Sequence, residues 1–300
     1  MKAHRIGSLD VSIVGLGCNN FGWRVDAAGT ADVVEAALDE GITFFDTADM
    51  YGGTKSEDFL GRALGRRRNE AVVATKFGWE IDAHRKGAHP DYVVRAIEDS
   101  LKRLATDRID LYQLHKPDPS VPIADTLGAL AGLVQAGKVR EIGCSNFSAE
   151  QLREAQAAKT DVHFVSAQNE YSLLHRDPER DVLPECERLG LAFIPYSPLA
   201  NGLLTGKYRQ GQPPPKGTRL TERRPTEERL VVVEALLAFA ESRGHTLLEL
   251  AFGWLTTNPL VASVIAGATH AAQVRANAAS VGWELSSEEL AEVDRILQHD

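Results

Sequence analysis

Short runs of β-branched and apolar residues alternate with amphipathic helical segments eight times along this chain. Such alternation is typical of βαβ units, in which parallel strands are joined by helices. A barrel of this kind takes about 250 residues. The 300 residues of the chain are therefore enough for one barrel. We predict an α/β fold, a (β/α)8 TIM barrel, in a single domain over residues 1–300.

The expected boundaries follow from apolar periodicity and from capping signals. The expected strands are Ser12–Gly17, Phe44–Thr47, Ala71–Lys76, Asp110–His115, Val139–Ser145, Val165–Asn169, Ala192–Tyr196 and Val261–Ile265. The expected helices are Thr30–Glu40, Ser56–Leu64, Pro90–Leu104, Pro122–Ala136, Ser148–Ala158, Arg180–Leu189, Glu227–Arg243, Leu247–Thr256 and Ala271–Ala279. Ser148 with Gln151 three residues later has the pattern of a capping box.

Both ends of the chain carry elements beyond the barrel. The segments His4–Ile6 and Val11–Ile13, on either side of Ser8–Asp10, predict a small β-hairpin before the first barrel strand. A helix is expected from Ser286, which has Glu289 three residues later.

Two connections are too long to be simple joints. They are Phe77–His89 and Ala200–Pro225, and each follows an expected strand. Loops longer than about 12 residues are usually functional or disordered. In a barrel these loops belong to the face that carries active sites.

The composition argues against several classes of protein. A net charge of −9 and a pI near 5.5 do not suit a nucleic-acid binder, which normally has a basic surface. Cys18, Cys144 and Cys186 are widely spaced, so neither a disulfide framework nor a zinc knuckle is indicated. No apolar run reaches signal length or the ~18 residues of a membrane span. We expect a cytoplasmic protein that binds neither nucleic acid nor membranes.

Polar residues gather at the carboxyl ends of the expected strands. They are Asp46, Lys76, His115, Ser145, Asn146, Gln168, Asn169 and Tyr196. Taken singly, Lys76 could extend to solvent, His115 could be a hydrogen-bonded core residue, and Asp46 could cap a turn. A closed barrel brings all the strand ends to one mouth, so the joint distribution predicts an active site there.

Several motifs resemble those of the aldo-keto reductase superfamily. They are Phe45–Gly52 with Ser56, Glu57, Leu60 and Gly61, then Thr75–Gly78, Asp110–His115, Gly143–Phe147, Gln168–Tyr171, Tyr196–Leu199 and Ile265–Thr269. They occur in the order found in that superfamily and cover nearly the whole chain. The resemblance implies an NAD(P)(H)-dependent oxidoreductase acting on carbonyl and alcohol groups.

The resemblance also implies a catalytic tetrad, with members matching Asp46, Tyr51, Lys76 and His115. Proton delivery to a carbonyl oxygen requires a phenol whose pKa of about 10 is brought nearer to neutral pH. Lys76 is expected to lower the pKa of Tyr51, and Asp46 to hold Lys76 charged. His115 is expected to orient the substrate oxygen. Hydride would pass between the nicotinamide and the substrate carbon, with no metal.

The cofactor, NADP(H) or NAD(H), is expected along the barrel mouth. Residues matching its contact positions are Ser145, Asn146 and Gln168 at the carboxamide, Tyr196 at the nicotinamide ring, Ser197, Leu199, Gly202 and Lys207 at the pyrophosphate, and Gly267, Thr269, Gln273 and Asn277 at the adenosine. NADPH-selective relatives often carry an Arg or Lys for the 2′-phosphate. Gly267–Ala272 contains neither, and the helical phase of Arg275 does not decide whether it reaches. The sequence therefore leaves NAD and NADP open.

Gly15-Leu16-Gly17 could be taken for the start of a Rossmann fingerprint. Asn20 stands where that fingerprint needs glycine, and the acidic residue that should end a second strand is missing. A tight first turn of the barrel, beneath the active site, is the better interpretation.

Substrate contacts are expected from aromatic residues. Trp23 and Trp79 follow the first and third strands and could face a small carbonyl or sugar substrate or fill gaps in the barrel, while Trp254 is expected in the core. Lys116 is the only cation beside His115, and exposure to solvent is its expected state.

Two other functions compete with the oxidoreductase. Potassium-channel β subunits resemble the same superfamily and act on a partner while keeping a bound cofactor. The chain begins almost at the barrel and keeps all four tetrad positions, which favours an enzyme. An unrelated barrel isomerase has little to support it. Substrate, reaction direction and oligomeric state are not determined by the sequence.

Overall fold

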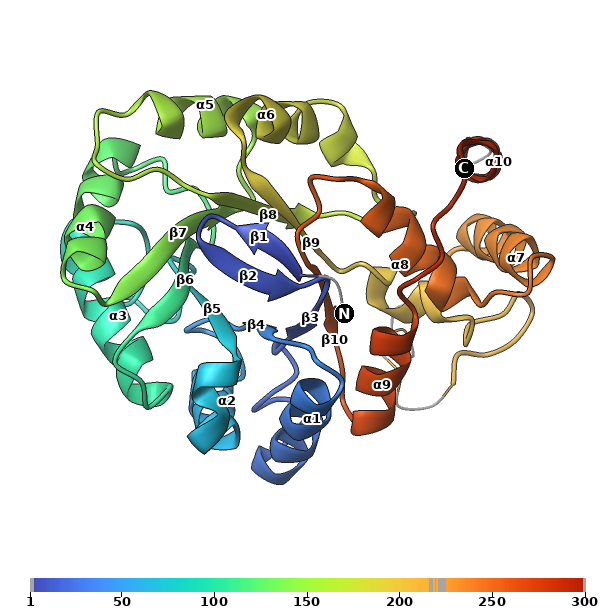
Figure 1. Ribbon diagram of the computed structural model, residues 1–300, viewed down its shortest axis with the longest axis horizontal. Helices are drawn as coiled ribbons and strands as arrows, with labels where there is room; N and C mark the ends of the chain where they lie inside the picture. Colours follow the sequence, from blue (N-terminus) through green and yellow to red (C-terminus); the bar gives the residue numbers. More distant parts are fainter. Residues whose placement is uncertain (1–2, 216–217, 219, 221–224, 299–300) are drawn as a thin grey trace.

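Eight parallel strands close into a barrel in the computed structural model, which describes residues 3–215, 218, 220 and 225–298 (Figure 1). The strands are β3 (Val14–Gly17), β4 (Phe44–Asp46), β5 (Val72–Phe77), β6 (Ile109–Leu114), β7 (Val139–Ser145), β8 (Ser166–Glu170), β9 (Ala192–Tyr196) and β10 (Val264–Gly267). They follow one another around the barrel in chain order, and β10 pairs with β3 to close it. The predicted (β/α)8 barrel is confirmed.

Helices surround the barrel (Figure 1). They are α1 (Ala27–Asp39), α2 (Lys55–Leu64), α3 (Pro90–Arg103), α4 (Ile123–Gln135), α5 (Ala149–Ala157), α6 (Val182–Leu189), α7 (Glu227–Glu241), α8 (Leu247–Thr257), α9 (Ala271–Ala279) and α10 (Ser287–Leu297), with short 3-10 segments η1 (Gly65–Glu70), η2 (Asp177–Glu179) and η3 (Ala200–Thr205). The predicted capping box of Ser148 and Gln151 begins α5, and one of Ser286 and Glu289 begins α10. The predicted C-terminal helix is therefore confirmed.

The N-terminal hairpin is present, with its turn earlier than predicted. Strand β1 (Ala3–Ile6) pairs antiparallel with β2 (Leu9–Ser12), so Gly7 and Ser8 form the turn. Gly7 has φ 58°, a left-handed conformation that glycine adopts without steric cost. Glu141 accepts a hydrogen bond from the Ser8 backbone N at 2.8 Å, which ties the turn to β7.

The last barrel strand also differs from its prediction. The apolar run beginning at Val261 suggested a strand over Val261–Ile265, whereas β10 covers Val264–Gly267. Val261 instead forms an isolated parallel bridge with Phe193 of β9. An apolar run marks buried backbone, but the neighbouring strands decide which residues join the barrel.

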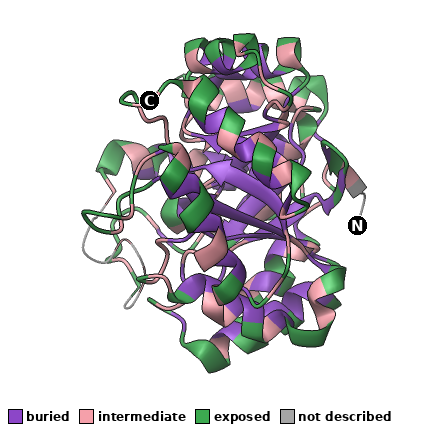
Figure 2. Ribbon diagram, turned by 90° about the vertical axis from the view of Figure 1, so that its left-hand side faces the viewer, coloured by how far each residue is buried: buried purple, intermediate pink, exposed green. Residues whose placement is uncertain are grey.

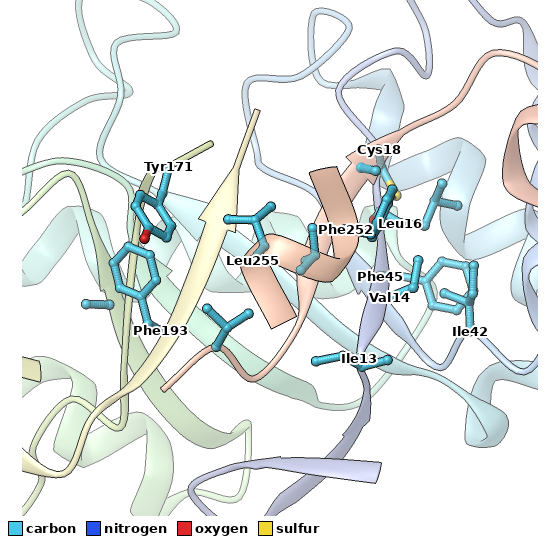
Figure 3. Packing of buried hydrophobic residues seen from close by; sticks show 14 of the residues in the cluster. Ile13, Val14, Leu16, Cys18, Ile42, Phe45, Tyr171, Phe193, Phe252 and Leu255 are labelled. Atoms are coloured by element: carbon cyan, nitrogen blue, oxygen red, sulfur yellow. The ribbon is translucent and has the colours of Figure 1, made fainter. Parts of the chain in front are cut away.

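The apolar core has two parts. Within the barrel, Ile6, Leu9 and Val11 of the hairpin pack with Phe44, Ala74, Leu111, Ile194, Ala262 and Ile265. Figure 1 shows the hairpin lying across this end of the barrel. The larger part lies between strands and helices, where Tyr171 and Phe193 meet edge to face at 5.8 Å (Figure 3). The hairpin covers the amino end of the barrel, and the active sites of such barrels lie at the opposite end, at the carboxyl ends of the strands.

The burial of the helices is one-sided, as expected for helices that pack on a barrel. Figure 2 shows buried strands at the centre and helices whose outer faces are exposed. Across the described part of the chain, no helix has both the length and the apolar character needed to cross a membrane.

Candidate active site

A cavity of about 940 Å³ opens at the carboxyl ends of the barrel strands. Its lining includes residues at or just after the end of every strand: Gly17, Asp46, Trp79, His115, Ser145, Gln168, Tyr196 and Gly267. Both long connections predicted from sequence contribute to it, the first through Trp79 and the second through residues of Ala200–Pro225 such as Gly202 and Lys207. Positions 216–217, 219 and 221–224 of the second connection lie outside the described residues.

Asp46 and Lys76 form an ion pair beneath the cavity. The Lys76 side chain is fully buried, and its ammonium donates to Asp46 Oδ1 and, at 2.8 Å, to the backbone oxygen of Thr47. Burial alone lowers the pKa of Lys76, but the charge of Asp46 and the hydrogen bond to Asp46 act in the opposite direction, and the pKa lies above its ordinary value. Lys76 is therefore a charged ammonium held by a carboxylate, as the sequence predicted.

Two side-chain amides hold the second oxygen of Asp46. Gln113 of β6 donates to Asp46 Oδ2 at 3.1 Å, and Gln168 of β8 donates to the same oxygen at 2.9 Å. Gln168 was expected at the cofactor carboxamide, and its NH2 group instead bonds within the protein. Gln113 was not predicted as a site residue, although it lies two positions before His115, in the strand whose carboxyl end carries that histidine.

Tyr51 lies beside this ion pair and His115. Lys76 Nζ is 5.1 Å from the centre of the Tyr51 ring, and the His115 ring meets that ring edge-on at 5.7 Å. Burial raises the pKa of Tyr51, while the charge of Lys76 acts in the opposite direction. The influence of Lys76 thus has the predicted sign, but the net pKa is raised rather than lowered. The phenol keeps its proton at neutral pH and is available as an acid.

The loop carrying Tyr51 is fixed by close backbone contact with the first βα loop. Gly52 has φ 59°, and a Cβ there would lie 2.2 Å from the backbone oxygen of Phe21. Ser56, at the start of α2, donates to the backbone oxygen of Cys18 at 2.8 Å. Any larger residue at position 52 would push these two loops apart and move Tyr51.

His115 is a neutral imidazole. Burial, then the charges of Lys76 and Lys116, hold its pKa well below 6.5. Its Nδ1 atom is buried and has no hydrogen-bond partner among the described residues. A neutral ring of this kind can donate a hydrogen bond to a carbonyl oxygen that enters the cavity, or accept one from a hydroxyl group.

Every residue expected at the cofactor lines the cavity, and four of them form one hydrogen-bond network. Asn146 donates to the His115 backbone oxygen at 2.9 Å and to Ser145 Oγ at 3.1 Å, and its own Oδ1 accepts from the Tyr196 hydroxyl at 2.9 Å. Ser145 donates to the backbone oxygen of Gln168 at 2.9 Å. The network joins the ends of four strands and fixes the Tyr196 ring at the cavity wall.

The far end of the cavity lies at α9. Gln273 Oε1 accepts from the backbone N and the hydroxyl of Thr269 at 2.8 Å and 3.1 Å. Arg275 points its guanidinium toward Glu40, the residue that follows α1, with 3.7 Å between Nε and the carboxylate. The arginine of α9 thus has a carboxylate at the end of a neighbouring helix as its ion-pair partner.

The two tryptophans expected at the substrate differ. Trp79 lines the cavity, and its ring lies 5.4 Å from that of His115. Trp23 is 68% exposed and is not among the lining residues, so its predicted place in the substrate pocket is not supported. Trp254 is buried against Tyr171, as predicted for a core residue.

Sequence reasoning missed the contribution of the first βα loop. Cys18, Asn19, Asn20 and Arg24 line the cavity, and Asn20 donates to the backbone oxygen of Ala268 at 3.2 Å. These residues follow the first barrel strand, so the rule used for the other strand ends would have found them. Nowhere in the described chain do three or more His, Cys, Asp or Glu side chains form a group able to hold a metal ion.

Similarity to known proteins places the chain in the class of (β/α)8-barrel oxidoreductases that act on CH–OH and C=O groups. Within that class the chain belongs to the aldo/keto reductase family, whose sequence model matches residues 13–298. Aldo-keto reductase YhdN of Bacillus subtilis (strain 168) is 35% identical to it, over 97% of this chain and 91% of that protein. Enzymes of this family generally use NAD(P)(H).

Two other similar proteins have names that describe different functions. A probable voltage-gated potassium channel subunit beta of Arabidopsis thaliana is 34% identical over 87% of this chain and 84% of its own length. The solved structure of glycerol dehydrogenase AKR11B4 from Gluconobacter oxydans has a TM-score of 0.86 and 33% identity, covering 99% of this chain and 95% of its own.

The cavity suits a pyridine dinucleotide. It extends from Tyr51 and His115 to Gln273 and Asn277, and its volume lies in the range of cofactor sites. Gly202 has φ 95°, and a Cβ there would lie 2.9 Å from Lys207 Nζ. Glycine at this position therefore leaves room for an ammonium above the loop, where it can meet a phosphate.

Proposed function

We propose that this protein interconverts a carbonyl group and an alcohol on a small aldehyde, ketone or sugar, with Tyr51 as general acid and base. The observation that supports it most directly is the Tyr51 phenol between a buried, charged Lys76 and a neutral His115. A bound nicotinamide, of NADP(H) or NAD(H), would supply or accept the hydride.

In the reductive direction the substrate oxygen would accept hydrogen bonds from the Tyr51 hydroxyl and the His115 ring. Tyr51 gives its proton to that oxygen as charge develops there, and Lys76 stabilises the resulting phenolate. Asp46 keeps Lys76 charged at a position from which water is excluded. Oxidation reverses the same transfer, with Tyr51 as the base.

We propose weak discrimination between the two nucleotides. A charge-assisted hydrogen bond to the 2′-phosphate would contribute about 1.5–3 kcal/mol. No such cation occurs in Gly267–Ala272, and Arg275 is directed to Glu40. Calorimetric titration of the purified protein with NADPH and NADH is therefore expected to give dissociation constants within about tenfold of each other.

The deciding experiment is Tyr51→Phe, with turnover followed at 340 nm over a panel of carbonyl compounds and sugars. Loss of the general acid should lower kcat by about 10²–10⁴-fold while cofactor affinity stays. Tyr171→Phe is the matched control, because the Tyr171 hydroxyl bonds to Glu179 away from the cavity. Equal kcat in wild type and Tyr51→Phe would refute the assigned role.

The second candidate is a regulatory subunit that binds the cofactor and acts on a partner. Its support is the similarity to the Arabidopsis thaliana channel subunit. Wild-type protein that binds NAD(P)(H) with no turnover on the whole panel would favour this candidate over the enzyme.

A further inference from the structure

The cavity is cationic although the chain is acidic. The net charge is −9. Yet Arg24, Lys116 and Lys207 line the cavity, and among the described lining residues Asp46 is the only carboxylate. Asp46 is neutralised by its pair with Lys76. A bound dinucleotide, itself an anion, accounts for cations near its phosphates but not for one at the Tyr51 end.

Lys116 is that cation. The sequence predicted it in solvent, but in the structure it is half-buried and lines the cavity directly after His115. Its Nζ lies 4.8 Å from the centre of the Trp79 ring, and its charge contributes to the lowered pKa of His115. Lys116 therefore belongs to the same wall as the histidine beside Tyr51.

The Trp79 ring contacts both His115 and Lys116. Its ring is tilted by 56° to the His115 ring at 5.4 Å, and Lys116 lies over it. Trp79 is 40% exposed, and its ring provides an apolar surface between the His115 imidazole and the Lys116 ammonium. A molecule whose oxygen reaches His115 would pass along this surface before it meets Lys116.

The ammonium of Lys116 has no close carboxylate partner in the described part of the chain. Asp118 is the nearest acid along the sequence and feels the charge of Lys116. Its oxygens, however, accept hydrogen bonds from the backbone N of Ala88 at 2.9 Å and from Ser120 Oγ at 2.6 Å. Lys116 is thus positioned by an aromatic ring rather than neutralised by a salt bridge, which leaves its charge available to a ligand.

We propose that the substrate carries an anionic group, a carboxylate or a phosphate ester, which Lys116 binds while the reacting carbonyl lies at Tyr51 and His115. This inference rests on the proposed function and adds a substrate class to it. The cation–π contact with Trp79 reduces the side-chain entropy that Lys116 loses on binding, so the contact favours a specific geometry.

The test uses two pairs of aldehydes that differ in charge. Succinic semialdehyde is compared with butanal, and glyceraldehyde 3-phosphate with glyceraldehyde, so that the pairs distinguish a carboxylate from a phosphate. Wild type is expected to prefer the anionic member of at least one pair. In Lys116→Met the ratio of kcat/KM for the anionic over the neutral member should fall by about 10–100-fold, chiefly through KM.

Two further variants and a change of salt concentration test whether the charge of Lys116 causes the preference. Lys116→Arg should restore most of the preference, because it keeps the charge. Lys102→Met removes an exposed lysine on α3 and should keep the wild-type ratio. Added salt should reduce the wild-type preference, since Trp79, over whose ring Lys116 lies, is 40% exposed to solvent.

The possible results separate the two levels of the proposal. Turnover that depends on Tyr51 but shows no preference for either anionic aldehyde, or a preference that persists in Lys116→Met, overturns the substrate class and leaves the proposed function standing. Absence of turnover with every carbonyl compound, charged or neutral, overturns both.

Discussion

Asp49 is a buried carboxyl two residues before Tyr51, and its replacement by Asn should change how stability depends on pH. It is 1% exposed; Oδ2 accepts from the Tyr92 hydroxyl at 3.3 Å, and Oδ1 has no partner among the described residues. Burial and then repulsion by Glu57 raise its pKa to about 7, against the weaker opposing effect of Arg103. The carboxyl therefore holds a proton that it would lose in the unfolded chain.

The sign follows from proton linkage. Below its ordinary pKa of 3.8, Asp49 is protonated whether the chain is folded or not. Between that value and about 7 the folded protein binds more protons than the unfolded chain, so stability falls as pH rises. A difference of about three pH units corresponds to about 4 kcal/mol, reached once pH exceeds the folded pKa. Of this, about 2 kcal/mol falls between about pH 5.5 and pH 8.5.

Asp49→Asn removes this titration. Between about pH 5.5 and pH 8.5, the free energy of unfolding of the variant should therefore rise by about 2 kcal/mol relative to that of wild type. Urea unfolding, followed by circular dichroism at each pH, measures the difference between the two proteins and cancels every other titrating group. Asp107→Asn, whose side chain is 90% exposed, is the control and should show no trend. A difference between wild type and Asp49→Asn that is constant with pH would refute the assignment of a raised pKa to Asp49.

Three further results are expected. Gly61→Ala should destabilise the fold by about 1–3 kcal/mol in thermal unfolding, because its Cβ would lie 2.5 Å from the backbone oxygen of Leu104, after α3. Gly128→Ala should stabilise the fold by about 0.5–1 kcal/mol, because a Cβ there would meet no described atom within 4 Å outside its own stretch of helix. The pH profile of kcat should show no inflection from His115 between about pH 6 and 8, because its pKa lies well below 6.5; an inflection lost in His115→Gln would contradict this. Gln113→Leu should lower the free energy of unfolding by about 1.5–3 kcal/mol, since Asp46 loses one amide donor, and an unchanged denaturation midpoint would argue against that contact.

The fold was predictable because its periodic signals are local. The bounds of Val139–Ser145, Ala192–Tyr196 and Ala271–Ala279 agree with the structure without change. Val139–Ser145 and Ala192–Tyr196 are runs whose apolar pattern begins and ends with its own element. At Val261 the pattern was ambiguous, because Val261 forms an isolated bridge with Phe193 of β9 and lies outside β10, and this pairing depends on residues far along the chain.

Only part of the site could be predicted in the same way. Strand ends converge in any closed barrel, so Asp46, Lys76 and His115 were expected together, and the structure brings them together. The contact between Gln113 and Asp46 joins residues 67 positions apart. A glutamine inside an apolar strand gives no local sign of its partner. The raised pKa of Tyr51 has the same origin, since burial is a property of the assembled barrel.

Several residues of the site have a strained backbone that local sequence preferences do not predict. The non-glycine residues with positive φ include Asn146 after β7, Ser197 after β9, and Ala200 and Asn201 in η3. Asparagine adopts this conformation readily, but serine and alanine do so at a cost of about 1–2 kcal/mol each. Asn146, Ser197 and Asn201 line the cavity, and Ala200 lies between two lining residues. The strain is therefore concentrated at the carboxyl end of the barrel, where the surrounding hydrogen bonds hold these residues in the conformation that shapes the site.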